Sequence, residues 1–217
     1  MDRSFFEGKK AVFLGDSITH GVGASCEENI YHAVLARSLK LGEVKNYGIN
    51  GSRIAHQELN PNGGAFSLRY ESMDDDADIV VVYGGVNDYL HGTAEFGTPA
   101  DRTVNTFYGA LHVLFSGLMR KYTDKTLIVM TPMHCLREND PQDPRNAVTG
   151  KLLSDYVAAI REVAEYYSMP LLDLYKLSGI RPSVEENRAH FLPDGLHPCD
   201  AGNKRIAERL EGFLLSL

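Results

Sequence analysis

Residues 11–21 have the sequence AVFLGDSITHG. The apolar run 11–14 is followed at once by Gly15, and an apolar run bounded by a turn residue is typical of a buried strand. Ser17 comes directly after this predicted strand. In open α/β folds the rim just past the strand ends is where ligands bind, so Ser17 lies where a catalytic side chain is expected.

The rest of the chain alternates between short apolar strands and longer amphipathic helices. The most continuous strand is IVVVY at 79–83, whose lack of polar alternation predicts a central strand covered on both faces. The other expected strands are 44–49, 126–130 and 170–174, and the expected helices are 29–41, 67–73, 101–122, 149–168 and 200–217. Segments 89–99, 133–148 and 179–192 are expected to be irregular. This alternation predicts an α/β protein with a parallel sheet and helices on both faces, as a single domain over 1–217.

Composition excludes several classes of function. The chain has 217 residues, 43% of them hydrophobic and 24% charged, with a net charge of −7, which argues against a nucleic-acid partner. No apolar run is long enough to cross a membrane, and residues 1–10 lack the apolar segment of a signal peptide, so we expect a cytoplasmic protein without membrane insertion. Cys26, Cys135 and Cys199 are widely spaced and odd in number, which favours a reducing compartment.

Four short motifs follow the predicted strands. Gly15-Asp16-Ser17 follows the first strand, Asn50-Gly51 the second, and Gly84-x-x-Asn87-Asp88 the third, while Asp194-x-x-His197 precedes the last helix. Because parallel strands end at the same edge of a sheet, these motifs are expected to meet there.

The residue types at that edge match acyl transfer. A serine hydroxyl becomes a good nucleophile when a base takes its proton, and His197 is the candidate base because imidazole titrates near neutral pH. Asp194 is placed to accept from the other ring nitrogen and so to orient His197. The backbone amides of Ser17 and Gly51 and the side chain of Asn87 are candidate donors to an oxyanion, and Gly51 lacks a Cβ that would block substrate.

Together these motifs resemble the SGNH (GDSL-type) hydrolases. The resemblance covers residues from about 11 to 198 and includes each signature block in order. It implies a flavodoxin-like three-layer sandwich with a five-stranded parallel sheet, and an esterase or lipase that needs no cofactor. It also implies Ser17 as nucleophile, His197 as base and Asp194 as orienting acid, with Ser17, Gly51 and Asn87 as the oxyanion hole.

Other residues near the strand ends are weaker candidates. Arg53 is a candidate contact for a substrate anion, with a surface ion pair as the alternative. Tyr89 and His134 are candidate pocket residues, although aromatic packing would explain Tyr89 equally well. Asp16 is expected to hold the turn through backbone amides rather than to act as a second acid. The acidic run 74–78 is expected to be solvated.

The substrate stays open at this stage. We expect a small-molecule ester with a short acyl group, and an O-acetylated carbohydrate is the first guess, although the absence of Trp weakens it. A lysophospholipase or thioesterase acting on longer chains is the main alternative. A non-catalytic binding module on the same fold is another. The third is a metal-dependent hydrolase that uses Asp194, His197 and the acidic run near Asp76. The oligomeric state is undetermined.

Overall fold

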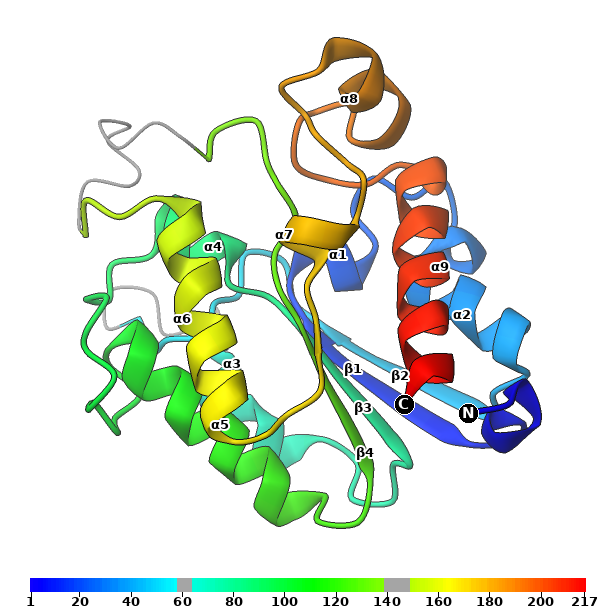
Figure 1. Cartoon of the computed structure of the whole chain (residues 1–217), viewed down its shortest axis with the longest axis horizontal. Helices are drawn as coiled ribbons and strands as arrows, with labels where there is room; N and C mark the ends of the chain where they lie inside the picture. Colours follow the sequence, from blue (N-terminus) through cyan, green and yellow to red (C-terminus); the bar gives the residue numbers. More distant parts are fainter. Residues whose placement is uncertain (58–63, 139–148) are drawn as a thin grey trace.

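A computed structural model describes residues 1–57, 64–138 and 149–217. Its centre is a sheet of five parallel strands in the order β2-β1-β3-β4-β5 (Figure 1). The strands are β1 (Lys10–Gly15), β2 (Glu43–Gly48), β3 (Ile79–Tyr83), β4 (Thr126–Met130) and β5 (Leu171–Leu172). The α/β fold with a five-stranded parallel sheet is therefore confirmed.

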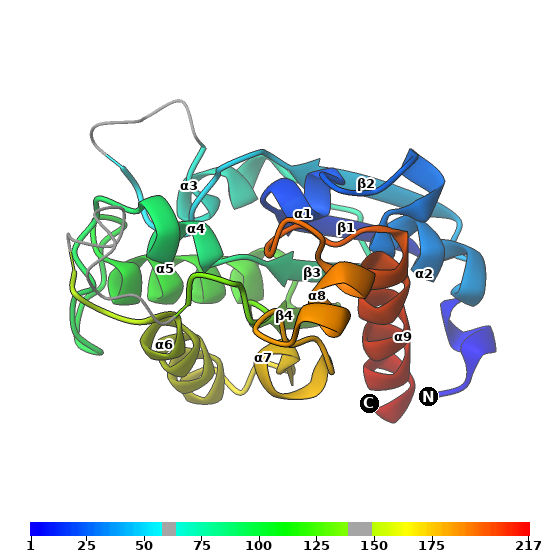
Figure 2. The same cartoon turned by 90° about the horizontal axis from the view of Figure 1, so that it is seen from above.

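Helices cover both faces of the sheet, which makes three layers (Figures 1 and 2). One face carries α3 (Phe66–Arg69), α4 (Val86–His91), α5 (Phe107–Lys121) and α6 (Leu153–Tyr166). The other carries α2 (Tyr31–Leu39) and α9 (Asp200–Ser216). The short helices α1 (Ser17–His20), α7 (Leu174–Leu177) and α8 (Glu185–Phe191) follow strands or precede α9, and the 3-10 turns are η1 (Arg3–Phe6), η2 (Glu27–Asn29) and η4 (Tyr70–Ser72).

The apolar run of β3 has partners on both sides. Val80 and Val82 belong to the core beneath α5 and α6, whereas Ile79, Val81 and Tyr83 belong to the core beneath α2 and α9. Successive side chains of a strand point to opposite faces, so a strand between two helical layers is apolar at every position. This explains why the sequence shows no polar alternation at this strand.

Several predicted boundaries were wrong. The helix expected over 101–122 begins at Phe107, because Thr106 caps it by accepting from the Gly109 amide at 3.1 Å. The segments expected to be irregular contain the end of α4, residues 89–91, and the whole of α8. Helix α8 carries Glu185 and Glu186 in its first turn and basic residues in its last, a charge pattern that favours a helix. Part of the expected loop 133–148, residues 139–148, lies outside the described residues.

The acidic run lies at the opposite edge of the sheet from Ser17. Lys10, the first residue of β1, pairs with Asp74 at 2.6 Å and with Asp76 at 2.7 Å. Asp75 and Asp76 are 88% and 75% exposed, as expected for a solvated run, whereas Asp74 and Asp78 are only 28% and 35% exposed. Among the described residues, no helix is both long enough and apolar enough to cross a membrane.

Candidate active site

The predicted motifs meet at the carboxyl edge of the sheet, around the junction of β1 and β3. In the strand order β2-β1-β3-β4-β5 the chain leaves β1 toward β2 on one side and later returns to β3 on the other. At such a switch point the loops after the two strands diverge and leave a crevice between them, which is where this class of fold binds ligands. Ser17 follows β1 and Asn87 follows β3, so both lie at this crevice.

Asp16 shapes the turn that carries Ser17. It is the N-cap of α1, and its carboxylate accepts from the Ile18 amide at 3.0 Å. This confirms the structural role predicted for Asp16. Burial raises the pKa of Asp16 to about 6, against the opposing effect of the Ile18 amide. Ser17 is the first residue of the helix, where backbone amides have no intrahelical acceptor and can bind an incoming oxygen.

Ser17, His197 and Asp194 form a continuous chain of hydrogen bonds. The hydroxyl of Ser17 lies 3.0 Å from Nε2 of His197, and Nδ1 of His197 lies 2.6 Å from Oδ2 of Asp194. The other carboxylate oxygen of Asp194 accepts from the amides of Leu196 at 2.9 Å and His197 at 2.7 Å. Partial burial opposes ionisation of Asp194, but the bonds from His197 and Leu196 outweigh it, so its pKa lies below the ordinary value. An ionised Asp194 accepts from Nδ1, which leaves Nε2 to take the serine proton.

The loop after β2 and the start of α4 supply the remaining donors. Gly51 has a φ of +71°, and a Cβ at this position would meet no protein atom within 4 Å. The Cβ side of Gly51 is therefore open within the described part of the chain. The side chain of Asn87 is 4% exposed, and its amide nitrogen donates to the Ser52 carbonyl at 3.2 Å. That bond uses one of its two N–H groups and orients the other, which can serve an oxyanion.

Asp88, in α4, anchors the loop that follows β2. Its two carboxylate oxygens accept from the amides of Ile54 at 2.8 Å and Ala55 at 2.9 Å. Burial raises the pKa of Asp88 to about 7, although these two amides favour its ionised form. Asp88 was part of a predicted motif, but its role as a loop anchor was not predicted.

Comparison with known proteins identifies the family. The profile of the GDSL-like Lipase/Acylhydrolase family matches residues 13–205. The chain belongs to this family. The predicted resemblance is thereby confirmed, and family membership indicates a hydrolase. A search of curated proteins gives no match.

Solved structures share the fold of this family member over nearly its whole length. A protein from Lactobacillus plantarum is 34% identical, with 97% of this chain and 98% of that chain covered and a TM-score of 0.84. A possible lipase from Chitinophaga pinensis is 20% identical, with 96% and 98% covered and a TM-score of 0.70. An acetyl xylan esterase is 21% identical, with 94% and 98% covered and a TM-score of 0.58. At 20% and 21% identity, the last two structures show only that the fold is shared.

The weaker candidates lie at different depths. Tyr89 is 2% exposed, packs edge-on against Tyr156 and donates to the Arg137 carbonyl at 2.5 Å, so it is part of the core. Arg53, two residues after Gly51, is partly buried and donates to the carbonyl of His91 at the end of α4, at 3.1 Å.

His134 lies at the end of β4 within a group of charged and aromatic side chains. Its Nδ1 is 2.7 Å from Glu138, which also pairs with Arg181 at 2.8 Å, and its ring packs on Tyr175. These contacts hold the first residues after β4 against the segment between α7 and α8. The side chain is thus already engaged, and its direct role in substrate binding stays a prediction.

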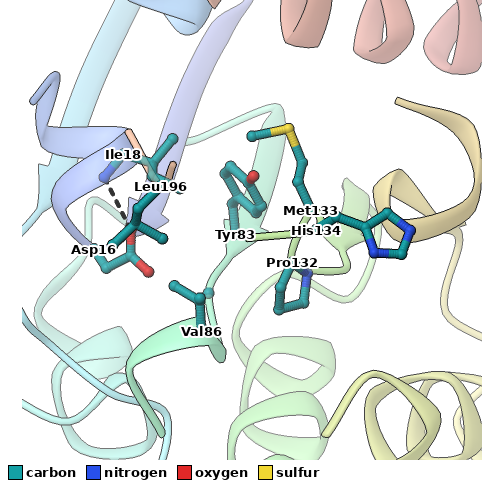
Figure 3. Close-up of a pocket in the computed structure, with 9 residues that line it drawn as sticks. Asp16, Ile18, Tyr83, Val86, Pro132, Met133, His134 and Leu196 are labelled. Carbon is teal, nitrogen blue, oxygen red and sulfur yellow. Dashed lines mark hydrogen bonds between the residues drawn. The ribbon is translucent and has the colours of Figure 1, made fainter. Parts of the chain in front are cut away.

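A small cavity lies among residues that neighbour the catalytic candidates in sequence, and Figure 3 shows the side chains that line it. Its volume of about 10 Å³ is the space of one water-sized sphere. It is lined by residues that flank the site in sequence or follow β3 and β4: Asp16, Ile18, Tyr83, Gly84, Val86, Pro132, Met133, His134 and Leu196. The hydroxyl of Tyr83 is buried close to the Met133 backbone, and no hydrogen bond of ordinary geometry is made to it within the described residues. Most of its lining residues are apolar, and Asp16, Tyr83 and His134 are the polar ones.

The metal-dependent alternative is contradicted by the position of its ligands. Asp76 is paired with Lys10 at the amino edge of β1, whereas Asp194 and His197 lie at the carboxyl edge with Ser17. Within residues 1–57, 64–138 and 149–217, no group of three or more His, Cys, Asp or Glu side chains is arranged to hold a metal ion.

Asn203 was missed by sequence reasoning. This residue of α9 is fully buried, donates to the Pro198 carbonyl at 2.8 Å and accepts from the Tyr31 amide at 3.0 Å. It therefore ties the turn after His197 to α2. Its position one turn into a predicted helix gave no signal, because an Asn there is most often solvated.

Proposed function

We propose that the chain is a serine ester hydrolase that cleaves small or short-chain acyl esters through an acyl-enzyme. The observation that carries this proposal is the hydrogen-bond chain from Ser17 through His197 to Asp194, at 3.0 and 2.6 Å, beside Gly51 and Asn87. A nucleophile, a base and an orienting acid in this order are what serine hydrolysis requires.

Each residue then has a defined step. The hydroxyl oxygen of Ser17 bonds to the ester carbonyl carbon while its proton passes to Nε2 of His197. The amides of Ser17 and Gly51 and the side chain of Asn87 stabilise the negative charge on the former carbonyl oxygen. His197 returns the proton to the departing alcohol as the carbon–oxygen bond breaks. Water, deprotonated by His197, then attacks the acyl-enzyme and releases the acid and Ser17.

The small size of the cavity lined by the sequence neighbours of Ser17 supports a short acyl group. Its volume of about 10 Å³ holds one water-sized sphere, which leaves no room for a long acyl chain. The residues that line it include sequence neighbours of Ser17, Asn87 and His197, namely Ile18, Val86 and Leu196. An O-acetylated carbohydrate is the first substrate to test, in line with the shared fold of the acetyl xylan esterase.

The proposal is tested by hydrolysis of p-nitrophenyl acetate. Wild type is expected to turn over, and Ser17→Ala is expected to lose nearly all of that activity. Ser116→Ala is the matched control, because Ser116 lies within α5 and its hydroxyl donates to the Val113 carbonyl of the same helix. Equal activity in wild type and Ser17→Ala would refute the nucleophile.

Acyl specificity is tested by a panel of nitrophenyl esters from acetyl to dodecanoyl. We expect kcat/KM to fall as the chain lengthens. A preference for long chains would instead support the lysophospholipase or thioesterase alternative. Saturable binding of esters with no turnover at all would support the binding-module alternative.

A further inference from the structure

Arg69, at the end of α3, directs a partly buried guanidinium at the loops that carry the candidate site. It donates to the Gly15 carbonyl at 2.5 Å, to the Ser52 hydroxyl at 3.1 Å, to the Gly64 carbonyl at 2.8 Å and to the Tyr47 carbonyl. Its planar group also lies over the ring of Phe66, 4.7 Å from the ring centre. These acceptors come from β1, from β2 and from the segments after β2, so one side chain bridges separate parts of the edge.

The Gly15 carbonyl is the point where these bridges converge. Besides Arg69, it accepts from the Ser52 hydroxyl at 3.2 Å and from the Ile49 amide at 3.1 Å. Gly15 ends β1 and is followed directly by Asp16 and Ser17. Ser52 directly follows Gly51. The contact between Gly15, Ser52 and Arg69 therefore joins the nucleophile turn to the loop of the oxyanion donor.

The same connection reaches Asn87. The backbone carbonyl of Ser52 accepts the side-chain amide of Asn87 at 3.2 Å, and Ser52 is fully buried. A shift of Ser52 would therefore move both the Gly51 backbone and the Asn87 amide relative to Ser17. Catalytic groups displaced by about 1 Å can lose about a hundredfold in rate, so such a shift has a measurable cost.

The charge of Arg69 is retained in spite of its partial burial. Burial lowers the pKa of Arg69 to about 10 while the nearby Asp16 carboxylate raises it, so the guanidinium stays charged at neutral pH. Burying a charge costs free energy unless its hydrogen bonds are well made. A planar fork of donors makes these bonds in several directions at once, which the single ammonium of Lys does not.

We propose that Arg69 is a positioning residue for the reaction, which sets the spacing between Ser17 and its oxyanion donors by holding the Gly15 carbonyl and the Ser52 hydroxyl together. This role rests on the proposed esterase function. In this role Arg69 does not contact the substrate. Arg69 acts through Gly15 and Ser52, so its loss affects the chemical step rather than substrate binding.

The test compares three variants with wild type on p-nitrophenyl acetate, with rates normalised to folded protein. Arg69→Lys keeps the charge without the fork, Arg69→Met keeps only the stem, and Ser52→Ala removes the hydroxyl between Arg69 and Gly15. We expect kcat to fall about tenfold to a hundredfold in the Arg69 variants and about tenfold in Ser52→Ala, with KM changed less than about threefold. Tyr122→Phe is the control: it removes a buried bond to the Asp74 carbonyl far from Ser17 and should lower stability without lowering kcat.

The outcomes separate the two proposals. Arg69→Lys and Ser52→Ala with wild-type kcat and only lowered stability, like Tyr122→Phe, would overturn the positioning role and leave the esterase intact. A rise in KM at constant kcat would also overturn it. Should the Arg69 variants fail to fold, Ser52→Ala decides alone. If wild type shows no turnover, or turnover that Ser17→Ala does not reduce, the proposed function is contradicted, and so is the positioning role.

Discussion

Replacement of Asp194 by Asn is expected to leave the fold intact and to reverse the hydrogen bond to His197. One carboxylate oxygen of Asp194 accepts from the amides of Leu196 and His197, and the other accepts from Nδ1 of His197 at 2.6 Å. An Asn that keeps the backbone bonds through its oxygen must present its NH₂ group to Nδ1. Nδ1 then becomes an acceptor and Nε2 carries the proton, so His197 cannot take the proton of Ser17.

The size of the loss follows from the exposure of Asp194. A buried orienting Asp changed to Asn costs a serine protease roughly ten thousandfold in kcat. The side chain of Asp194 is 54% exposed, so water can reach the ring and partly restore the productive tautomer. We therefore expect kcat to fall by roughly a hundredfold to a thousandfold at neutral pH, because an exposed charge contributes less than a buried one.

The assay is nitrophenyl acetate hydrolysis by wild type, Asp194→Asn and Asp194→Ala. Asn is expected to be no more active than Ala, because it enforces the wrong tautomer while Ala only removes the orienting group. Asp101→Asn is the control, since that carboxylate caps a turn near Thr98 and Thr106, before α5. An Asp194→Asn variant within about tenfold of wild type would refute the tautomer argument.

Three further predictions follow from the surrounding residues. Asn87→Ala removes an oxyanion donor and should lower kcat by about a hundredfold to a thousandfold with little change in KM; a change confined to KM would contradict that role. The pKa of Asp88 is raised to about 7 in the folded chain, above about 3.9 in the unfolded chain, so its stabilising effect is full below pH 4 and is lost as pH rises through 7. From pH 5 to pH 8 the free energy of unfolding from urea titrations should fall by about 2–3 kcal/mol through this group, and the fall should be smaller in Asp88→Asn; an equal fall in both would exclude Asp88 as its source. Asn203→Ala leaves the buried Tyr31 amide without its acceptor and should cost about 1–3 kcal/mol of stability by thermal unfolding; a variant as stable as wild type would contradict its anchoring of the Pro198 turn.

The sequence predicted the parts of this molecule that depend on local pattern. The apolar runs 79–83 and 126–130 became β3 and β4 without a change of boundary, because burial between helical layers demands uninterrupted apolar residues. The meeting of Ser17 with His197, 180 positions apart, was also predicted, since parallel strands share an edge. Both inferences start from short motifs, and the general geometry of parallel sheets supplies the rest.

What was missed depends on contacts between distant segments. Nothing near Arg69 indicates that its guanidinium meets Gly15 and Ser52, since the short helix α3 only acquires this position once β1 and β2 have paired. Tyr89 was equally compatible with a pocket wall and with the core, and packing against Tyr156 decided for the core. Helix starts were wrong where a capping residue such as Thr106 overrode an apolar pattern that continued upstream.

The most direct test of the central claim is covalent labelling of the nucleophile. The protein is treated with a fluorophosphonate, and the modified peptide is located by mass spectrometry in wild type, Ser17→Ala and His197→Ala. We predict one adduct on Ser17 in wild type, none in Ser17→Ala, and much slower labelling in His197→Ala, because the imidazole activates the hydroxyl at 3.0 Å. An adduct on a different residue, or equal labelling of Ser17→Ala, would contradict the assignment of Ser17 as the nucleophile.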